Sequence, residues 1–162
     1  MAQSSTTRLD LTTEGETGVI VTRRFAAPPE RVYRAHVEPA LLQRWCTGPD
    51  GWTMPVCISE PHPGGRIRFE WSDGTAGFFL TGEYLEIDPG RRIVHVERMH
   101  LPDPTPDNRV TTTFTPDGTG TLLRLVMQLP NAEARAAMLA TGMDEGMEAS
   151  YARLEAHLAG AA

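Results

Sequence analysis

The sequence predicts a single α+β domain, in which a curved antiparallel sheet of about seven strands lies against one long C-terminal helix. Alternating apolar and polar runs recur from residue 52 to 129, and turns rich in Asp, Gly and Pro separate them. Residues 132–158 then repeat apolar side chains at helical spacing. The length of 162 residues suits one domain.

The first predicted elements are a strand and two short helices. TGVIVTRRFAA, residues 17–27, indicates a strand that ends at Pro28 and Pro29. Proline cannot donate to a strand ladder, and its fixed backbone angle suits a first helical turn. ERVYRAHV follows with helical spacing, and Pro39 ends that helix and begins the next one, ALLQRW. Two short helices cannot form a core alone, so we expect them to lie against the sheet.

The remaining strands are predicted to form successive hairpins. WTMPVCISE would place Trp52, Met54, Val56 and Ile58 on one face, with Pro55 indicating an edge position or a bulge. RIRFEWSD alternates in the same way, and Asp/Gly/Pro turns connect it to FFLTGEYLEI, IVHVERM, RVTTTF and TLLRLVMQL. The pattern of FFLTGEYLEI fits either orientation, because Gly82 is a candidate bulge. Only LPDPTPDN is too proline-rich for a tight turn, and we expect it to be a mobile flap.

One uninterrupted helix is predicted to close the chain. Asn131 is a good N-cap, and the helical pattern runs from Ala132 to Leu158. Its predicted apolar stripe consists of Leu139, Met143, Met147, Ser150, Tyr151, Leu154 and Leu158. Its predicted solvent face carries Asp144, Glu145, Glu148 and Glu155.

The composition excludes several classes of function. A formal net charge of −6 leaves no basic stripe for nucleic acid or an anionic membrane surface. No apolar stretch is long enough to span a membrane, and residues 1–15 lack the apolar core of a signal peptide, so we expect a cytoplasmic protein. We expect residues 1–15 to be a flexible tail before a single domain at 16–162. Two cysteines without CxxC spacing and five scattered histidines predict neither a metal nor another cofactor.

Four stretches, in this order, resemble a known family: FAAPPERVYRAHVEPALLQRW, PGGRIRFEW, GEYLEIDPGRRIVHVE and GMEASYARLEAHLA. The family is the START-like (SRPBCC) superfamily with its helix-grip (START/Bet v 1-like) fold, and within it the proteins similar to the activator of heat-shock protein 90 ATPase. The resemblance implies an elongated, mostly apolar cavity between sheet and long helix, which the superfamily uses for lipids, sterols, polyketides and plant hormones. It supplies no shared catalytic residue.

This chain departs from the family pattern at three positions. Cys46, Glu97 and Met147 stand where family members often carry tryptophan. A tryptophan buries about 150 to 250 Å². If these positions face the interior, the pocket would be roomier and more polar than is usual in the family.

The candidate ligand-binding residues come from the predicted inner faces: Trp45, Trp52, Met54, Val56, Phe69, Trp71, His95, Glu97, Met143, Met147 and Tyr151. The rings and methionines suit either a core or the wall of a cavity. The two short helices would close one end of that cavity, with Trp45 and Trp52 at its mouth.

His95 and Glu97 are the sharpest polar signal, because residues two apart on a strand share a face. Local alternation favours solvent for this pair, with Val94 and Val96 inside, whereas the family pattern places Ile93, His95 and Glu97 inside. An inward pair could hydrogen-bond a ligand or act as acid and base. The sequence leaves both orientations open.

The sequence therefore predicts a protein that binds a hydrophobic or amphipathic small molecule, and it assigns no catalytic residue. Two alternatives remain: a cyclase- or hydrolase-type enzyme using the same cavity, and a co-chaperone-like module acting on a heat-shock ATPase. Ligand identity and homodimer formation are left open.

Overall fold

A computed structural model describes residues 8–101 and 103–160. The strands are β1 (Asp10–Glu14), β2 (Gly18–Phe25), β3 (Thr53–Ser59), β4 (Arg66–Ser72), β5 (Gly77–Asp88), β6 (Arg92–His100), β7 (Asn108–Asp117) and β8 (Gly120–Gln128). The helices are α1 (Pro29–Val37), α2 (Pro39–Trp45), α3 (Ala132–Leu139) and α4 (Met143–Gly160). The predicted α+β class and helix-grip fold are confirmed.

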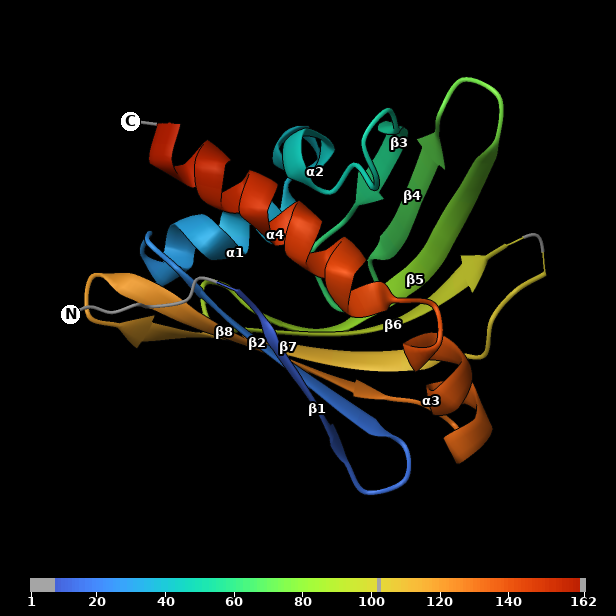
Figure 1. Cartoon of the computed structure of the whole chain (residues 1–162). Helices are drawn as coiled ribbons and strands as arrows, with labels where there is room; N and C mark the ends of the chain where they lie inside the picture. The colour runs from blue at the N-terminus through green and yellow to red at the C-terminus, as the bar shows by residue number, and fades with distance from the viewer. Residues whose placement is uncertain (1–7, 102, 161–162) are drawn as a thin grey trace.

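All the strands join one antiparallel sheet in the order β1-β2-β8-β7-β6-β5-β4-β3. The sheet is strongly curved, and α4 lies across its inner side with α1 and α2 beside it (Figure 1). We call the side that faces α4 the inner face. Val19, Val21, Leu123 and Leu154 are fully buried there, so the core lies between the sheet and the C-terminal half of α4.

The sheet begins earlier than the sequence predicted. Residues 1–15 were expected to be a flexible tail, but Asp10–Glu14 form β1 and pair with β2 at one edge of the sheet. The short polar segment DLTTE has little apolar periodicity of its own, and its pairing with β2 makes it a strand. Residues 1–7 lie outside the described residues.

The predicted C-terminal helix is two helices. Gly142, at a φ of 75°, separates α3 from α4. Only glycine adopts this left-handed conformation at little cost, so it commonly follows the last turn of a helix. Asn131 accepts a hydrogen bond from the Ala134 amide at 2.8 Å and caps α3 as predicted. Because the pattern continues on both sides of Gly142, the break was missed.

The solvent face predicted for the long helix is wrong at two positions. Glu148 and Glu155 accept hydrogen bonds from the Arg23 guanidinium, each at 3.1 Å. Arg23 lies on the inner face of β2 and is 2 % exposed. This buried ion network fixes α4 to the sheet, which the apolar stripe alone did not predict.

Pro104 and Thr105 of the proline-rich segment contact the end of β6. The Thr105 amide donates to the Met99 carbonyl at 2.8 Å, and His100 pairs with Pro104. No helix within residues 8–101 and 103–160 is long and apolar enough to cross a membrane.

Candidate functional site

Cross-strand pairing decides which way His95 and Glu97 face. His95 lies opposite Val110, and Glu97 lies opposite Asn108. Directly paired residues share a face of the sheet, and Val110 is buried in the core. His95 and Glu97 therefore lie on the inner face, as the family pattern indicated and local alternation did not.

Together His95, Glu97 and Asn108 form a polar cluster among apolar side chains. His95 Nε2 lies 2.7 Å from Glu97 Oε1, and the two side chains are 17 % and 25 % exposed. A carboxylate only accepts hydrogen bonds, so Nε2 carries the proton and donates it to Glu97.

Three atoms of this cluster are buried without a partner in the part of the chain that the structure describes. They are His95 Nδ1 and both polar side-chain atoms of Asn108, a residue only 3 % exposed. A buried polar group without a hydrogen bond costs about 1 to 3 kcal/mol. Buried polar atoms without a partner in the protein are open to a partner from outside it, either a water molecule or a ligand atom.

Gly82 leaves room beside the polar cluster. It sits between Ile67 and Glu97 in one cross-strand row of the inner face. A Cβ atom at this position would lie 2.5 Å from the Val96 carbonyl oxygen, so the approach of β6 requires glycine. The row consequently has no side chain at its centre. The bulge in β5 lies between Tyr84 and Glu86 instead of at Gly82.

Aromatic rings cover the inner face of β4 and β5. Trp71 stacks on Phe78 with 4.9 Å between ring centroids, and Phe69 meets Trp71 edge-on at 5.9 Å. Trp52 lies against Phe78 at 5.3 Å. The Trp71 indole donates to the Cys46 carbonyl at 2.8 Å, which fixes its orientation.

Burial is uneven along α4 and across the inner face. Tyr151, Leu154 and Leu158 in the C-terminal half of α4 are buried, whereas Met143 and Met147 near its start are half-buried. On the inner face of the sheet, the half-buried positions gather on β4 to β6. Together with the two half-buried methionines of α4 they form what we call the open inner region. It consists of Phe69, His95, Glu97, Met99, Met143 and Met147.

The interior next to this region favours uncharged groups. Burial raises the pKa of Cys46 to about 12 and that of Cys57 to about 11. Burial also raises the pKa of Tyr84 to about 12, against the hydrogen bond at 2.7 Å to Ser59. The pKa of Tyr151 is raised chiefly by burial, and the Glu97 charge adds to it. All four side chains stay neutral at physiological pH.

Four predicted site residues lie elsewhere, and one of them, Tyr151, is buried in the packed core. Trp45 is 4 % exposed, donates from its indole to the Ala35 carbonyl at 2.9 Å and stacks on Tyr151, so it belongs to the core and does not mark a mouth. Met54 is buried in the same core. Val56 pairs with Glu70 on the outer face, because a bulge between Thr53 and Val56 reverses the alternation. That bulge and the edge position of β3 agree with the interpretation of Pro55.

Asn108 and Met99 complete the region and were missed from the sequence. Met99 continues the alternation of His95 and Glu97, which would have identified it once β6 was oriented. Asn108 shares its face with Val110, Thr112 and Phe114, but it follows a proline-rich segment and was assigned to that loop.

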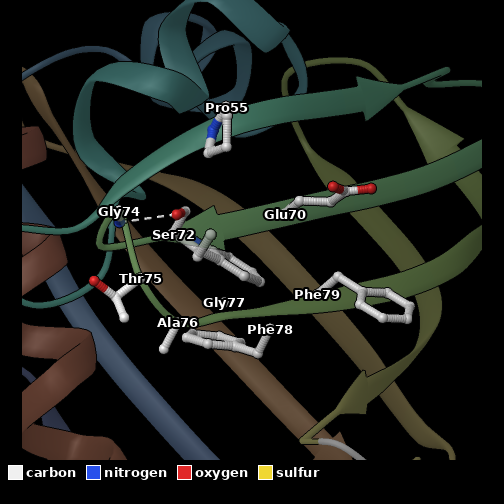
Figure 2. A pocket seen from close by; sticks show the side chains of 10 residues that line it. Pro55, Glu70, Ser72, Gly74, Thr75, Ala76, Gly77, Phe78 and Phe79 are labelled. Carbon is white, nitrogen blue, oxygen red and sulfur yellow. Dashed lines mark hydrogen bonds between the residues drawn. The ribbon is translucent and has the colours of Figure 1, made fainter.

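Two depressions lie at the surface, and neither is between the sheet and α4. One, of about 340 Å³, surrounds the tip of the β4–β5 hairpin (Figure 2). The polar groups of this turn bond to each other, since the Gly74 amide donates to Ser72 Oγ and two amides donate to Asp73. The other, of about 400 Å³, lies over β5 and β6 beside the exposed Arg98–Asp107 ion pair. The interior cavity stays a prediction.

Comparison with known proteins identifies the family. The profile described as "Activator of Hsp90 ATPase homolog 1-like protein" matches residues 26–159. The chain belongs to this family. The resemblance to the START-like (SRPBCC) superfamily drawn from the sequence is thereby confirmed. No match was found among curated proteins.

Solved structures of proteins from other organisms share the fold. A Rhodobacter sphaeroides protein is 33 % identical, with a TM-score of 0.89 over 94 % of this chain and 98 % of its own. A Mycobacterium smegmatis protein is 24 % identical, with a TM-score of 0.82 over 92 % and 95 % of the two chains. A Chromobacterium violaceum protein is 27 % identical, with a TM-score of 0.73 over 88 % and 96 %.

Proposed function

We propose that the protein binds an amphipathic small molecule at the open inner region. The apolar part of the ligand lies against Phe69, Met99 and Met147, and its polar end lies at the cluster of His95, Glu97 and Asn108. The observation that carries this proposal is the buried, unpartnered side chain of Asn108 beside half-buried apolar residues.

The apolar residues of the region support ligand binding in two ways. Phe69, Leu80 and Met99 are neighbours across β4, β5 and β6, so they form a continuous apolar row. The methionines opposite them are flexible and polarisable, which suits ligands of variable shape. Covering about 100 Å² of such surface contributes about 2.5 kcal/mol.

The three departures from the family pattern also support this site. Cys46 and Met147 pack against the core as half-buried residues, and Glu97 lies on the inner face. All three therefore replace an inward ring with a smaller or polar side chain, which leaves more of the interior to a ligand.

Fluorescence of N-phenyl-1-naphthylamine, a neutral apolar probe, tests the proposal. We expect saturable binding to the wild-type protein and about 10-fold weaker binding to Phe69→Ala, because the variant loses a ring of the apolar row. Phe79→Ala is the matched control, since Phe79 lies next to this row on the outer face and stacks on His100. Absence of binding, or equal weakening by both substitutions, would contradict the proposal.

Family membership favours a second candidate, an interaction with a heat-shock protein 90-type ATPase. This function would use an outer surface of the protein and would not need the open inner region. Adding the protein to a purified ATPase of this type from the same organism should then raise its rate of ATP hydrolysis. An unchanged rate and no co-purification would exclude it.

A further inference from the structure

We infer that the polar end of the ligand is an uncharged hydrogen-bonding group, a hydroxyl or a carboxamide, which donates to His95 Nδ1 and pairs with the Asn108 amide. The inference rests on the proposed function and specifies the chemistry of the same site.

The acceptor at His95 follows from its bond to Glu97. A neutral His95 ring that donates from Nε2 to Glu97 Oε1, at 2.7 Å, presents a lone pair at Nδ1. Nδ1 is buried and has no partner within residues 8–101 and 103–160. A hydroxyl or an amide N–H supplies the missing donor, whereas a carboxylate has none to give.

Asn108 extends the recognition from one hydrogen bond to several. Its Oδ1 accepts, its Nδ2 donates, and both are buried and unpartnered in the described part of the chain. A carboxamide presents the complementary pair of groups, and a hydroxyl serves as either donor or acceptor. Asn108 lies directly opposite Glu97, two pairs along the ladder from the His95–Val110 pair and next to it on the same face, so one small polar group can bind both side chains.

The charges around the cluster oppose an anionic ligand. The cations near the interior are already engaged: Arg23 by Glu148, Glu155 and the Arg24 carbonyl, and the part-buried Arg153 by the Trp45 and Gly48 carbonyls. Glu97 places a carboxylate within the cluster itself. Burial also keeps the neighbouring thiols and phenols neutral by raising their pKa values. A carboxylate would therefore lose its hydration without gaining a cation in return.

A charged amine is disfavoured for a different reason. An ammonium group could pair with Glu97, but it offers no acceptor to Asn108 Nδ2 and must lose its hydration to enter the buried cluster. A carboxamide can satisfy both Asn108 atoms, and a hydroxyl that donates to His95 Nδ1 can accept from Asn108 Nδ2, each at a lower desolvation cost than a charged group.

A series of ligands with one chain and four polar ends tests the inference. 1-Decanol, decanamide, decanoate and decylamine are titrated against the complex of wild-type protein with N-phenyl-1-naphthylamine. We expect decanol and decanamide to displace the probe at concentrations at least about 10-fold lower than decanoate and decylamine. Equal displacement by all four, or tightest binding of either charged compound, would overturn the inference and leave the proposed function standing. Failure of the probe itself to bind would overturn both.

Variants on β6 locate the contact. We expect His95→Phe to weaken decanol binding about 10-fold and to leave decanoate binding unchanged. His100→Phe is the matched control, because His100 belongs to the same strand and stacks on Phe79 at the outer face. Equal effects of the two substitutions would contradict the contact.

Nitrogen NMR on the wild-type protein gives a measurement that needs no variant. In the ligand-free protein, His95 should show the tautomer with its proton on Nε2. Added decanol should shift the His95 Nδ1 resonance and leave those of the other histidines unchanged. The opposite tautomer, or a Nδ1 resonance that does not respond to saturating decanol, would refute the assignment.

Discussion

Arg23 and Arg24 are adjacent on β2 and occupy opposite faces of it. Arg23 lies under α4, where its guanidinium binds Glu148 and Glu155 and sits 4.9 Å from the centre of the Phe25 ring. Arg24 pairs with Asp117 on the outer face, where both side chains are about half exposed. One arginine therefore attaches a helix to the sheet, and its neighbour forms an exposed ion pair on the opposite face.

This pair gives a prediction with an internal control. Arg23→Met should lower the free energy of unfolding by about 3 kcal/mol, because it leaves two largely buried carboxylates without their cation. Arg24→Met should change it by less than about 0.5 kcal/mol, as is usual for exposed ion pairs. Urea unfolding of both variants measures the difference. A loss below about 1 kcal/mol for Arg23→Met would show that the network contributes little.

His36 links stability to pH. Its ring packs between Trp45 and Phe114, with centroid distances of 4.9 and 5.3 Å, and its Nδ1 donates to the Val32 carbonyl. Burial lowers the pKa of His36 from 6.5 to about 4, although the bond to Val32 opposes that shift. Between these two values the unfolded chain binds the proton and the folded chain does not.

Stability contributed by the neutral His36 ring should therefore be complete above pH 6.5 and fall as the pH drops toward 4. The loss approaches about 3 kcal/mol at the lower limit. His36→Phe should remove this component, so the difference in unfolding free energy between wild type and variant should change across this window. His62→Gln, an exposed substitution, controls for the loss of a histidine. A pH-independent difference for His36→Phe would contradict the account.

Two glycines four residues apart occupy different positions: one lies at the break between two helices and the other lies inside a helix. Gly142 has a φ of 75° between α3 and α4, whereas Gly146 lies within α4. An added Cβ would meet no neighbouring atom within 4 Å at either position among the described residues. The described residues therefore give no packing reason for a glycine at position 146.

Substitution by alanine should consequently have opposite effects at the two glycines. Gly142→Ala should destabilise the protein by about 1 kcal/mol, because alanine is strained at positive φ. Gly146→Ala should stabilise it by about 1 kcal/mol, because alanine is the better helix former. Thermal unfolding measures both, and effects of the same sign would show that the break between α3 and α4 is not set by Gly142.

The order of the elements could be predicted from the sequence because each one carries a local signal. Pro28 and Pro39 delimit the first two helices, and Gly-containing turns separate the hairpins. The missed features depend on contacts remote in sequence. β1 is a strand through its pairing with β2, and Glu148 turns inward through Arg23, which is 125 residues away.

The candidate site could be predicted only in part. Alternation placed His95 and Glu97 on one face, but the identity of that face came from the pairing of β6 with β7. The Val56 assignment failed because the bulge before it changes the phase of the strand. Sequence periodicity fixes which residues share a face within a regular strand, and tertiary pairing decides where that face points.

The molecule as a whole has an interior with two unequal halves. Its packed half lies under the C-terminal part of α4, where Arg23, Tyr151 and Leu154 hold the helix to β2 and β8. Its other half, toward α3, has half-buried methionines on α4 and, on the inner face of β6 and β7, a polar cluster with atoms that lack a partner among the described residues. Our proposal places the ligand in this second half.

Methyl NMR of the methionines tests ligand binding at this second half most directly. The chain has seven methionines, which include Met99, Met143 and Met147 in the open inner region and Met54 in the packed core. Titration with 1-decanol should shift the methyl resonances of Met99, Met143 and Met147 saturably while that of Met54 moves little. Shifts confined to other methionines, or no saturable shift at all, would contradict a ligand site between the sheet and the start of α4.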